Sequence, residues 1–395
     1  MITQVLPNYS RAPLRFVKGE GCWLFDEKNK RYLDLGAGIA VTALGHAHPE
    51  LVAAIQEQAT KLWHVSNLYE IPNQEELAER LVSETFSDTV FFTNSGAESM
   101  ECAIKMARKY WFEKGEPNRS TIITFDNAFH GRTMATISAV GSEKLTKGFG
   151  PLLPGFIQIP IEEDNYSQLK NKIQDPDVAA IIVEPIQGEG GIIPLSDDFL
   201  KVIRNFCDQT GVLLIFDEIQ CGVGRTGKLF AHEWAGVYPD IMAIAKGIGN
   251  GFPLGACLAT EEAASGMTAG THGSTYGGNP LACAVGLKVL DIVSHPDFLA
   301  DVSRKAGFFR QKLESLIAEH SEIFELVRGE GLMLGMKCKV PNMDVVAMAY
   351  KHNLLLVPGG DNVIRLLPAL NISEVELTEA FDRLEQTALS LEATL

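Results

Sequence analysis

A lysine and an aspartate stand at the ends of two apolar segments, where such side chains could do chemistry. Lys246 follows the apolar run 240–245 and precedes the glycine-rich stretch KGIGNG. A lysine in such a dry setting has a lowered pKa and becomes a nucleophile, able to form a Schiff base with an aldehyde. Asp217 follows the apolar run 211–216 in FDEIQ, where a carboxylate needs a cationic partner such as a protonated ring nitrogen. Gln220 could donate to an oxygen on the same ring.

A third apolar run, at 89–93, is followed by the sequence TNSGAE. Ser95, Gly96 and Ala97 open a predicted helix there. The free N–H groups of a helix N-terminus can bind an anion, and small residues let the anion approach. Ser95 is equally an ordinary helix cap, so this segment alone leaves both interpretations open.

Two further apolar runs lead into FHGRT and EPIQGEGG. Phe129 and His130 offer a flat face to an aromatic ring, and Arg132 offers a planar fork to a carboxylate. A core phenylalanine and a surface arginine are the alternative for that pair. Glu184 and Glu189 would, taken singly, be turn residues.

The stretch GVGRTGKL presents a competing interpretation, because its G-x-x-x-x-G-K spacing approaches that of a P-loop. Leu229 stands where a P-loop needs a serine or threonine hydroxyl for magnesium. The glycines also lie several residues beyond the apolar run instead of following it directly. A plain glycine loop is therefore favoured over a triphosphate site.

Taken together, the segments supply an anion-binding helix end, a flat aromatic face, a carboxylate for a pyridinium nitrogen and an amine for an aldehyde. These are the requirements of pyridoxal 5'-phosphate. The conjunction is far more specific than any one segment.

The elements that must position these residues are short apolar runs at 89–93, 121–125, 178–184, 211–216, 240–245 and 255–259. Unbroken apolar runs of strand length are typical of a largely parallel sheet buried on both faces. Helical patterns lie between several of them, which predicts an α/β architecture. Ligands in such folds bind beyond the carboxyl ends of the strands. After about residue 290, helices predicted at 297–320 and 373–393 bracket short strands, and Ser373 with Glu376 forms a capping box.

Composition narrows the function classes. The net charge of −16 makes nucleic acid a poor partner. No signal peptide and no apolar stretch near the roughly 20 residues of a membrane span is present, so no membrane association is expected. Seven cysteines without framework spacing indicate reduced thiols and a cytoplasmic location, and no metal site is expected.

The chain resembles the class III, or ω-amino-acid, aminotransferases of fold type I along nearly its whole length. The matching motifs are LDLGAGIAVTALGHAHPEL, HVSNLY, NSGAE, FHGRT, EPIQGEGG, FDEIQ, GRTGKLFA, AKGIGNGFPLGA, HGSTYGGNPLACA, RGEGLMLG and IRLLPAL. The resemblance implies a large, mostly parallel cofactor-binding domain at 56–290 and a smaller α+β domain at 291–395. The segment 1–55 would pack with the small domain. Cys221 departs from the usual threonine and Asn250 interrupts the glycine run, but neither position carries the chemistry.

By this resemblance Lys246 and Asp217 are the catalytic residues. Lys246 would form the Schiff base with pyridoxal phosphate and move the proton between substrate and cofactor carbons. Asp217 would keep the ring nitrogen protonated, and Phe129 would stack on the ring. Thr275 would reach the phosphate of a neighbouring subunit, which implies a homodimer with shared sites. The cofactor-binding set is then Ser95, Gly96, Ala97, Phe129, Asp217, Glu218, Ile219, Gln220, Lys246 and Thr275.

Within the class, the motifs are most similar to those of enzymes that transfer the δ-amino group of N-acetylornithine to 2-oxoglutarate in arginine biosynthesis. Succinyl-diaminopimelate, from lysine biosynthesis, is a further candidate substrate. Arg132 would bind the carboxylate distal to the reacting amine, and Arg365 the α-carboxylate of glutamate. Glu189 would neutralise Arg365 when the ω-amine substrate is bound, and Ser274 favours the N-acetylornithine type.

Two other functions remain open. The substrate could be ornithine or 4-aminobutyrate, on the same cofactor chemistry. The chain could also be an inactive structural or regulatory relative, although the intact Lys246, Asp217 and Arg132 argue against that.

Overall fold

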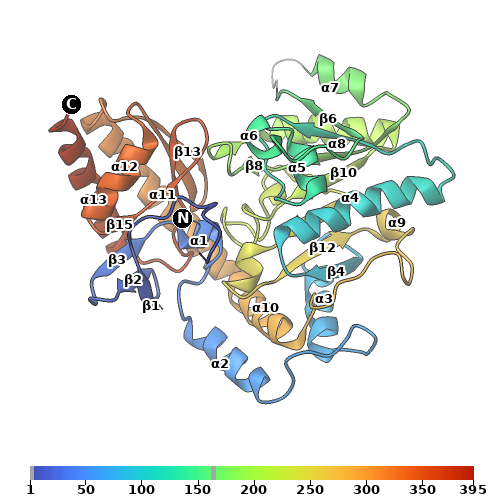
Figure 1. The fold of residues 1–395 in the computed structure, drawn as a ribbon, viewed down its shortest axis with the longest axis horizontal. Coiled ribbons are helices and arrows are strands. Elements are labelled where there is room, and N and C mark those ends of the chain that lie inside the picture. The colour runs from blue at the N-terminus through green and yellow to red at the C-terminus, as the bar shows by residue number, and fades with distance from the viewer. Residues whose placement is uncertain (1–3, 162–165) are drawn as a thin grey trace.

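The fold comes from a computed structural model that describes residues 4–161 and 166–395. Its centre is a seven-stranded sheet (Figure 1). The strand order is β4 (Thr89–Thr93), β12 (Gly255–Ala259), β11 (Ile241–Ile244), β10 (Leu213–Asp217), β7 (Val178–Val183), β5 (Thr121–Phe125) and β6 (Phe156–Ile159). β12 runs antiparallel to both of its neighbours, and the remaining pairs are parallel. An α/β fold with a mostly parallel sheet is confirmed.

Alternation along the strands buries both faces of the sheet. Leu213 and Ile215 pack into one hydrophobic cluster with helix α4 (Gly96–Glu113), whereas Leu214 and Phe216 pack into another with α8 (Asp197–Thr210). Adjacent residues of a strand point to opposite faces, so a continuous apolar run is what such a strand requires. The edge strand β6 was not predicted, because its sequence FIQI is short and only partly buried.

Further helices surround this sheet. α10 (Pro280–Val293) packs against α2 (Pro49–Ala59) and α3 (Pro72–Ser83). The shorter helical segments are α1 (Ala37–Ala40), α5 (Met134–Val140), α6 (Glu143–Thr146), α7 (Ser167–Lys172), α9 (Glu261–Ala264), η1 (Ala231–Glu233) and η2 (Lys246–Gly249). The two-residue strands β8 (Ile186–Gln187) and β9 (Ile193–Pro194) form a small ribbon.

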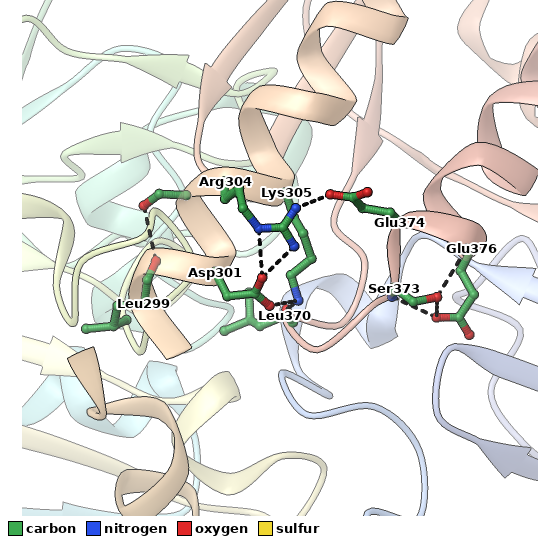
Figure 2. Close-up of polar contacts among 9 residues, drawn as sticks. Leu299, Asp301, Arg304, Lys305, Leu370, Ser373, Glu374 and Glu376 are labelled. Carbon is green, nitrogen blue, oxygen red and sulfur yellow. Dashed lines mark hydrogen bonds and ion pairs between the residues drawn. The ribbon is translucent and has the colours of Figure 1, made fainter. Parts of the chain in front are cut away.

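The C-terminal part has its own sheet and core. Its sheet order is β13 (Phe324–Glu330), β14 (Met333–Cys338), β17 (Val363–Leu366) and β16 (Val357–Pro358). Helices α11 (Pro296–Glu319), α12 (Asn342–Lys351) and α13 (Glu374–Glu392) contribute to the same core. The predicted capping box of Ser373 and Glu376 is confirmed at the start of α13 (Figure 2).

The N-terminal strands lie beside this C-terminal part, as the blue and orange-to-red ribbons show (Figure 1). β1 (Phe16–Glu20), β2 (Trp23–Asp26) and β3 (Arg31–Asp34) form a sheet that β15 (Leu354–Leu355) completes. The division into 1–55, 56–290 and 291–395 stays a proposal, and its boundaries fall inside α2 and α10. Among the described residues, no helix has the length and apolarity to cross a membrane.

Candidate active site

A cavity of about 480 Å³ lies beyond the carboxyl ends of β10 and β11. Residues from segments far apart in the sequence line it, as expected for an open α/β sheet. The predicted site residues that it brings together are Ser95, Gly96, Ala97, Phe129, Arg132, Asp217, Ile219, Gln220 and Lys246. His130 and Glu184, which were not in the predicted cofactor-binding set, line the same cavity.

The N-terminus of α4 forms one end of the cavity. Ser95 is the N-cap, and its Oγ accepts a hydrogen bond from the N–H of Glu98 at 3.3 Å. The N–H groups of Gly96 and Ala97 have no intrahelical acceptor, as at any helix start. A Cβ on Gly96 would come within 2.8 Å of Ile219, so only glycine fits between the helix and that side chain. This end of the cavity can therefore accept an anion such as a phosphate.

Asp217 forms a hydrogen bond with His130. The His130 Nδ1 and the Asp217 Oδ2 are 2.8 Å apart, and both side chains are buried. Burial opposes the charge on His130, but the hydrogen bond and charge of Asp217 and the charge of Glu184 outweigh it and raise the pKa of His130. The imidazole therefore holds the Asp217 carboxylate in a fixed position through this buried hydrogen bond.

Glu184 links this pair to two neighbouring loops. Its carboxylate accepts hydrogen bonds from the N–H groups of Phe129 at 2.7 Å and Gly188 at 3.0 Å. Burial and the charge of Asp217 raise the pKa of Glu184 to about 7, against the opposing effects of His130 and the two N–H groups. Glu184 therefore fixes the backbone at Phe129 rather than acting as an isolated turn residue.

Lys246 begins the 3₁₀ segment η2 directly after β11 and lines the cavity. Its φ of 48° lies in the left-handed region, which is uncommon for a residue with a side chain and is typical of functional positions. Burial lowers the pKa of the Lys246 amine, and the nearby Asp217 carboxylate only partly offsets this. At neutral pH a larger fraction of this amine is therefore unprotonated than in an exposed lysine, and only the unprotonated amine can act as a nucleophile or base.

Two buried polar atoms in the cavity wall have no partner among the described residues. They are Oε1 of Gln220 and Nε2 of His130. Gly188 leaves room for the first, because a Cβ there would lie 2.4–2.6 Å from the Gln220 amide. Buried polar atoms are nearly always satisfied, so these atoms favour a polar ligand in the cavity. Together with the anion-binding helix end and Lys246, they fit a phosphorylated aromatic aldehyde.

Glu218 does not line this cavity, although it was expected in the cofactor-binding set. Its carboxylate accepts from the N–H groups of Ala231 and His232, both at 2.8 Å, and pairs with His232 Nδ1 at 2.9 Å. Adjacent side chains at a strand end point to opposite sides. Glu218 thus organises the loop after β10 instead of facing the ligand.

A second, larger cavity of about 1090 Å³ borders the first and shares Phe129 and Arg132 with it. Arg132 is exposed and has no ion pair in the described part of the chain. Glu189 lines this cavity, and its Oε1 lies 3.0 Å from Nη1 of the buried Arg365. The cleft therefore contains the open guanidinium of Arg132 and the carboxylate of Glu189, which pairs with the buried Arg365 behind the lining residues.

Ser274 and Thr275 lie in a third cavity, away from Lys246. Ser274 Oγ accepts from the N–H of Gly277 at 2.8 Å and lies 3.3 Å from the Asn94 amide. Thr275 is exposed. Neither side chain lines the cavity that contains Lys246.

Together, the fold and this site identify the class of the protein. The class III aminotransferase family matches residues 5–388, and the chain belongs to that family. The protein is an aminotransferase, and pyridoxal 5'-phosphate is its cofactor.

Individual relatives agree with this placement. The acetylornithine aminotransferase of Rhodobacter capsulatus is 64% identical, covering 99% of this chain and 99% of its own. That of Mesorhizobium japonicum is 58% identical over 97% of this chain and 96% of its own. The crystal structure of N-acetylornithine aminotransferase from Stenotrophomonas maltophilia matches at 38% identity and TM-score 0.86, covering 98% of each chain. Ornithine aminotransferase from Toxoplasma gondii matches at 32% identity and TM-score 0.95, covering 99% of this chain and 94% of that one.

Proposed function

We propose that the protein transfers the δ-amino group of N-acetylornithine to 2-oxoglutarate, as a step of arginine biosynthesis. The observation that carries this proposal is that Glu189, which lines the same cleft as the open Arg132, pairs with the buried Arg365 at 3.0 Å. Arg132 can bind a substrate with one carboxylate. Arg365 can bind a second carboxylate when Glu189 moves away from it. The curated relatives from Rhodobacter and Mesorhizobium are named for the same substrate.

The cofactor-binding roles follow from the residues around the first cavity. The N–H groups of Gly96 and Ala97 would hold the phosphate, and Phe129 would lie against the ring. Asp217, which is hydrogen-bonded to His130, would hold the proton on the ring nitrogen. When bound, pyridoxal phosphate supplies an aldehyde that accepts the amino group and a ring that takes up electrons. The amide N–H of Gln220, which lines the cavity, would donate to the ring oxygen.

Lys246 would act on protons in this site. Its amine is partly buried with a lowered pKa, so near neutral pH a larger fraction is unprotonated than for an exposed lysine. An unprotonated amine could take a proton from the substrate carbon that bears the amino group and deliver it to a carbon of the cofactor.

The two arginines would divide the substrates between them. Arg132 would bind the α-carboxylate of N-acetylornithine in one half-reaction and the side-chain carboxylate of glutamate in the other. Arg365 would bind the α-carboxylate of glutamate after Glu189 moves away. For the ω-amine, which has no carboxylate at that position, Glu189 would stay paired with Arg365 and avoid a buried unpaired charge costing several kcal/mol.

Half-reaction spectra test this function directly. N-Acetylornithine, succinyl-diaminopimelate, ornithine and 4-aminobutyrate are added separately to the purified enzyme, and the cofactor absorbance is followed. Fast conversion by N-acetylornithine with much slower conversion by ornithine is the expected result. Comparable rates with the first two would place the enzyme in lysine biosynthesis as well. Reaction with only ornithine or 4-aminobutyrate would contradict the proposed substrate, while leaving the aminotransferase class intact.

We propose that the chain works as a homodimer. Large apolar side chains stay exposed in one stretch of sequence, where Trp63, Leu68 and Tyr69 are 65%, 86% and 67% exposed. The ring of His64 in the same stretch lies 5.3 Å from that of Tyr276, beside the exposed Thr275. A second copy that covers this surface would bring Thr275 toward a neighbouring phosphate site. Sedimentation analysis at micromolar concentration should give a dimer, and a monomer with full activity would contradict the proposal.

We also propose a cytoplasmic location. All seven cysteines are free and buried, as expected for a protein that folds in a reducing compartment. Fractionation of the source cells with an antibody against the protein tests this, and recovery outside the cytoplasm would overturn it.

A further inference from the structure

Arg225 is a buried arginine without an acidic partner in the described part of the chain. It belongs to the glycine loop after β10 and is 2% exposed. Its Nη1 donates to the carbonyl oxygen of Leu332 at 3.2 Å and to that of Pro368, whereas its Nη2 has no partner among the described residues. Burial lowers the pKa of the guanidinium to about 9. Burying a positive charge without an acidic partner costs free energy, so the two hydrogen bonds of Arg225 must compensate for it or serve a function.

The two carbonyl groups mark one end of the ladder that carries Arg365. In the antiparallel pairing of β14 and β17, Gly335 lies opposite Arg365. Three residues beyond this pair are Leu332 and Pro368, which therefore face each other past the end of the ladder. Proline has no N–H and cannot extend the ladder itself. The guanidinium takes the place of the missing hydrogen bonds and joins the two chain segments.

The same loop begins at the cofactor-contacting end of β10. Asp217 and Gln220 lie at its start, and the Glu218 carboxylate binds the N–H groups of Ala231 and His232 at its far end. The backbone reinforces the junction, because the N–H of Leu332 donates to the carbonyl of Arg225 at 3.0 Å. Arg225 thus connects the loop that presents Asp217 to the strand that presents Arg365.

A second buried cation contacts the chain two residues beyond Pro368. Lys305 of α11 is 4% exposed, and its Nζ donates to the carbonyl of Leu370 at 2.9 Å and pairs with Asp301 (Figure 2). Unlike Arg225, this lysine has a carboxylate partner and comes from the same part of the fold as Arg365. Its hydrogen bond and ion pair in the described chain are to Leu370 and Asp301 and to no residue of the cofactor loop, which makes it a matched comparison.

We propose that Arg225 is a positioning residue that sets Arg365 relative to the cofactor loop for the substrate with two carboxylates. This inference rests on the proposed function of Arg365. Arg225 lines neither of the two cavities of the proposed active site. Its removal should weaken recognition of glutamate and 2-oxoglutarate, which need Arg365, more than recognition of the ω-amine, which needs Arg132.

The test compares Arg225→Met, Arg225→Lys and Lys305→Met in the holoenzyme. KM and kcat are measured for 2-oxoglutarate and for N-acetylornithine, together with Tm. Arg225→Met should raise the KM for 2-oxoglutarate about tenfold, the effect of losing one well-placed hydrogen bond, and that for N-acetylornithine less than about twofold. Arg225→Lys keeps the charge but lacks the fork, so it should show a smaller shift in the same direction. Lys305→Met should lower Tm without the selective change in KM.

Equal changes in both KM values for the Arg225 variants, or the same selective change in Lys305→Met, would overturn the proposal. Arg225→Lys is read by the same criteria if Arg225→Met does not fold. A wild-type enzyme that uses ornithine instead of N-acetylornithine would refute the proposed substrate only. In that case the comparison is run with ornithine, because 2-oxoglutarate still requires Arg365.

Discussion

The imidazole of His130 lies 2.8 Å from the carboxylate of Asp217, and both side chains are buried at the back of the cofactor cavity. The two residues are far apart in the chain, one following β5 and the other ending β10. Because a hydrogen bond in a buried setting is strong, His130 fixes the position of the Asp217 carboxylate.

Replacing His130 by Phe should therefore reduce kcat about 10- to 100-fold, the range expected for losing a hydrogen bond to a charged group. The Asp217 carboxylate would then lack the hydrogen-bond donor that fixes its position. His130→Asn retains an N–H close to the position of Nδ1 and should recover most of the activity. Steady-state kinetics on the three proteins is the measurement, and equal kcat in His130→Phe and the wild type would contradict this role.

Glu184 should make stability depend on pH. The pKa of Glu184 is raised to about 7 from an ordinary value near 4.5, so the folded protein binds this proton more tightly than the unfolded chain. The wild-type free energy of unfolding should therefore fall, relative to Glu184→Gln, as pH rises from about 4.5 to about 7, by up to about 3 kcal/mol. Urea unfolding of the cofactor-free proteins across this range tests the sign. A difference that is independent of pH would show that Glu184 titrates normally.

Lys246→Ala should abolish turnover, with a loss of about a thousandfold or more in kcat. The buried amine is the group with a lowered pKa in the cavity, and alanine offers neither a nucleophile nor a base. The exposed Lys172, which forms an ion pair with Asp175, gives a matched control. Lys172→Ala should keep wild-type activity, and retention of activity by Lys246→Ala would refute the assignment.

Glu189→Ala should separate the two half-reactions. Without the carboxylate, Arg365 has no partner when N-acetylornithine is bound, whereas glutamate still supplies one. We expect the N-acetylornithine half-reaction to slow about tenfold or more and the glutamate half-reaction to change little. Stopped-flow absorbance of the cofactor measures each separately. If both half-reactions of Glu189→Ala remain as fast as in the wild type, Glu189 does not alternate with the glutamate carboxylate as the partner of Arg365.

Cys221 should be chemically inert in the folded enzyme, although it follows the cofactor-contacting residues. Burial and the neighbouring Glu218 and Asp217 charges raise the pKa of its thiol well above the ordinary value. Because only the thiolate reacts readily, iodoacetamide at pH 8 should leave Cys221 unmodified in the native protein and label it after unfolding. Peptide mass spectrometry distinguishes the two states. Rapid labelling in the native enzyme would show an accessible thiolate.

The sequence alone determined the residues with which the chemistry is built and the elements that hold them. The strands around Asp217 and Lys246 could be predicted because a strand buried on both faces needs an unbroken apolar run, which is a local property. Small residues at 95–97 likewise indicated a helix start without knowledge of any partner. The class III resemblance then linked these local patterns to one reaction.

Only the tertiary structure decided which polar groups meet. Asp217 could be assigned a cationic partner by charge arguments, but His130 is 87 residues away, and Arg365 lies 176 residues from Glu189. Contacts over such distances depend on how strands and loops assemble, which no local pattern encodes. Glu218 points away from the cavity for the same reason, since the direction of a side chain at a strand end is set by the strand around it. The link between Arg225 and the strand of Arg365 arises only when the two parts of the fold pack together.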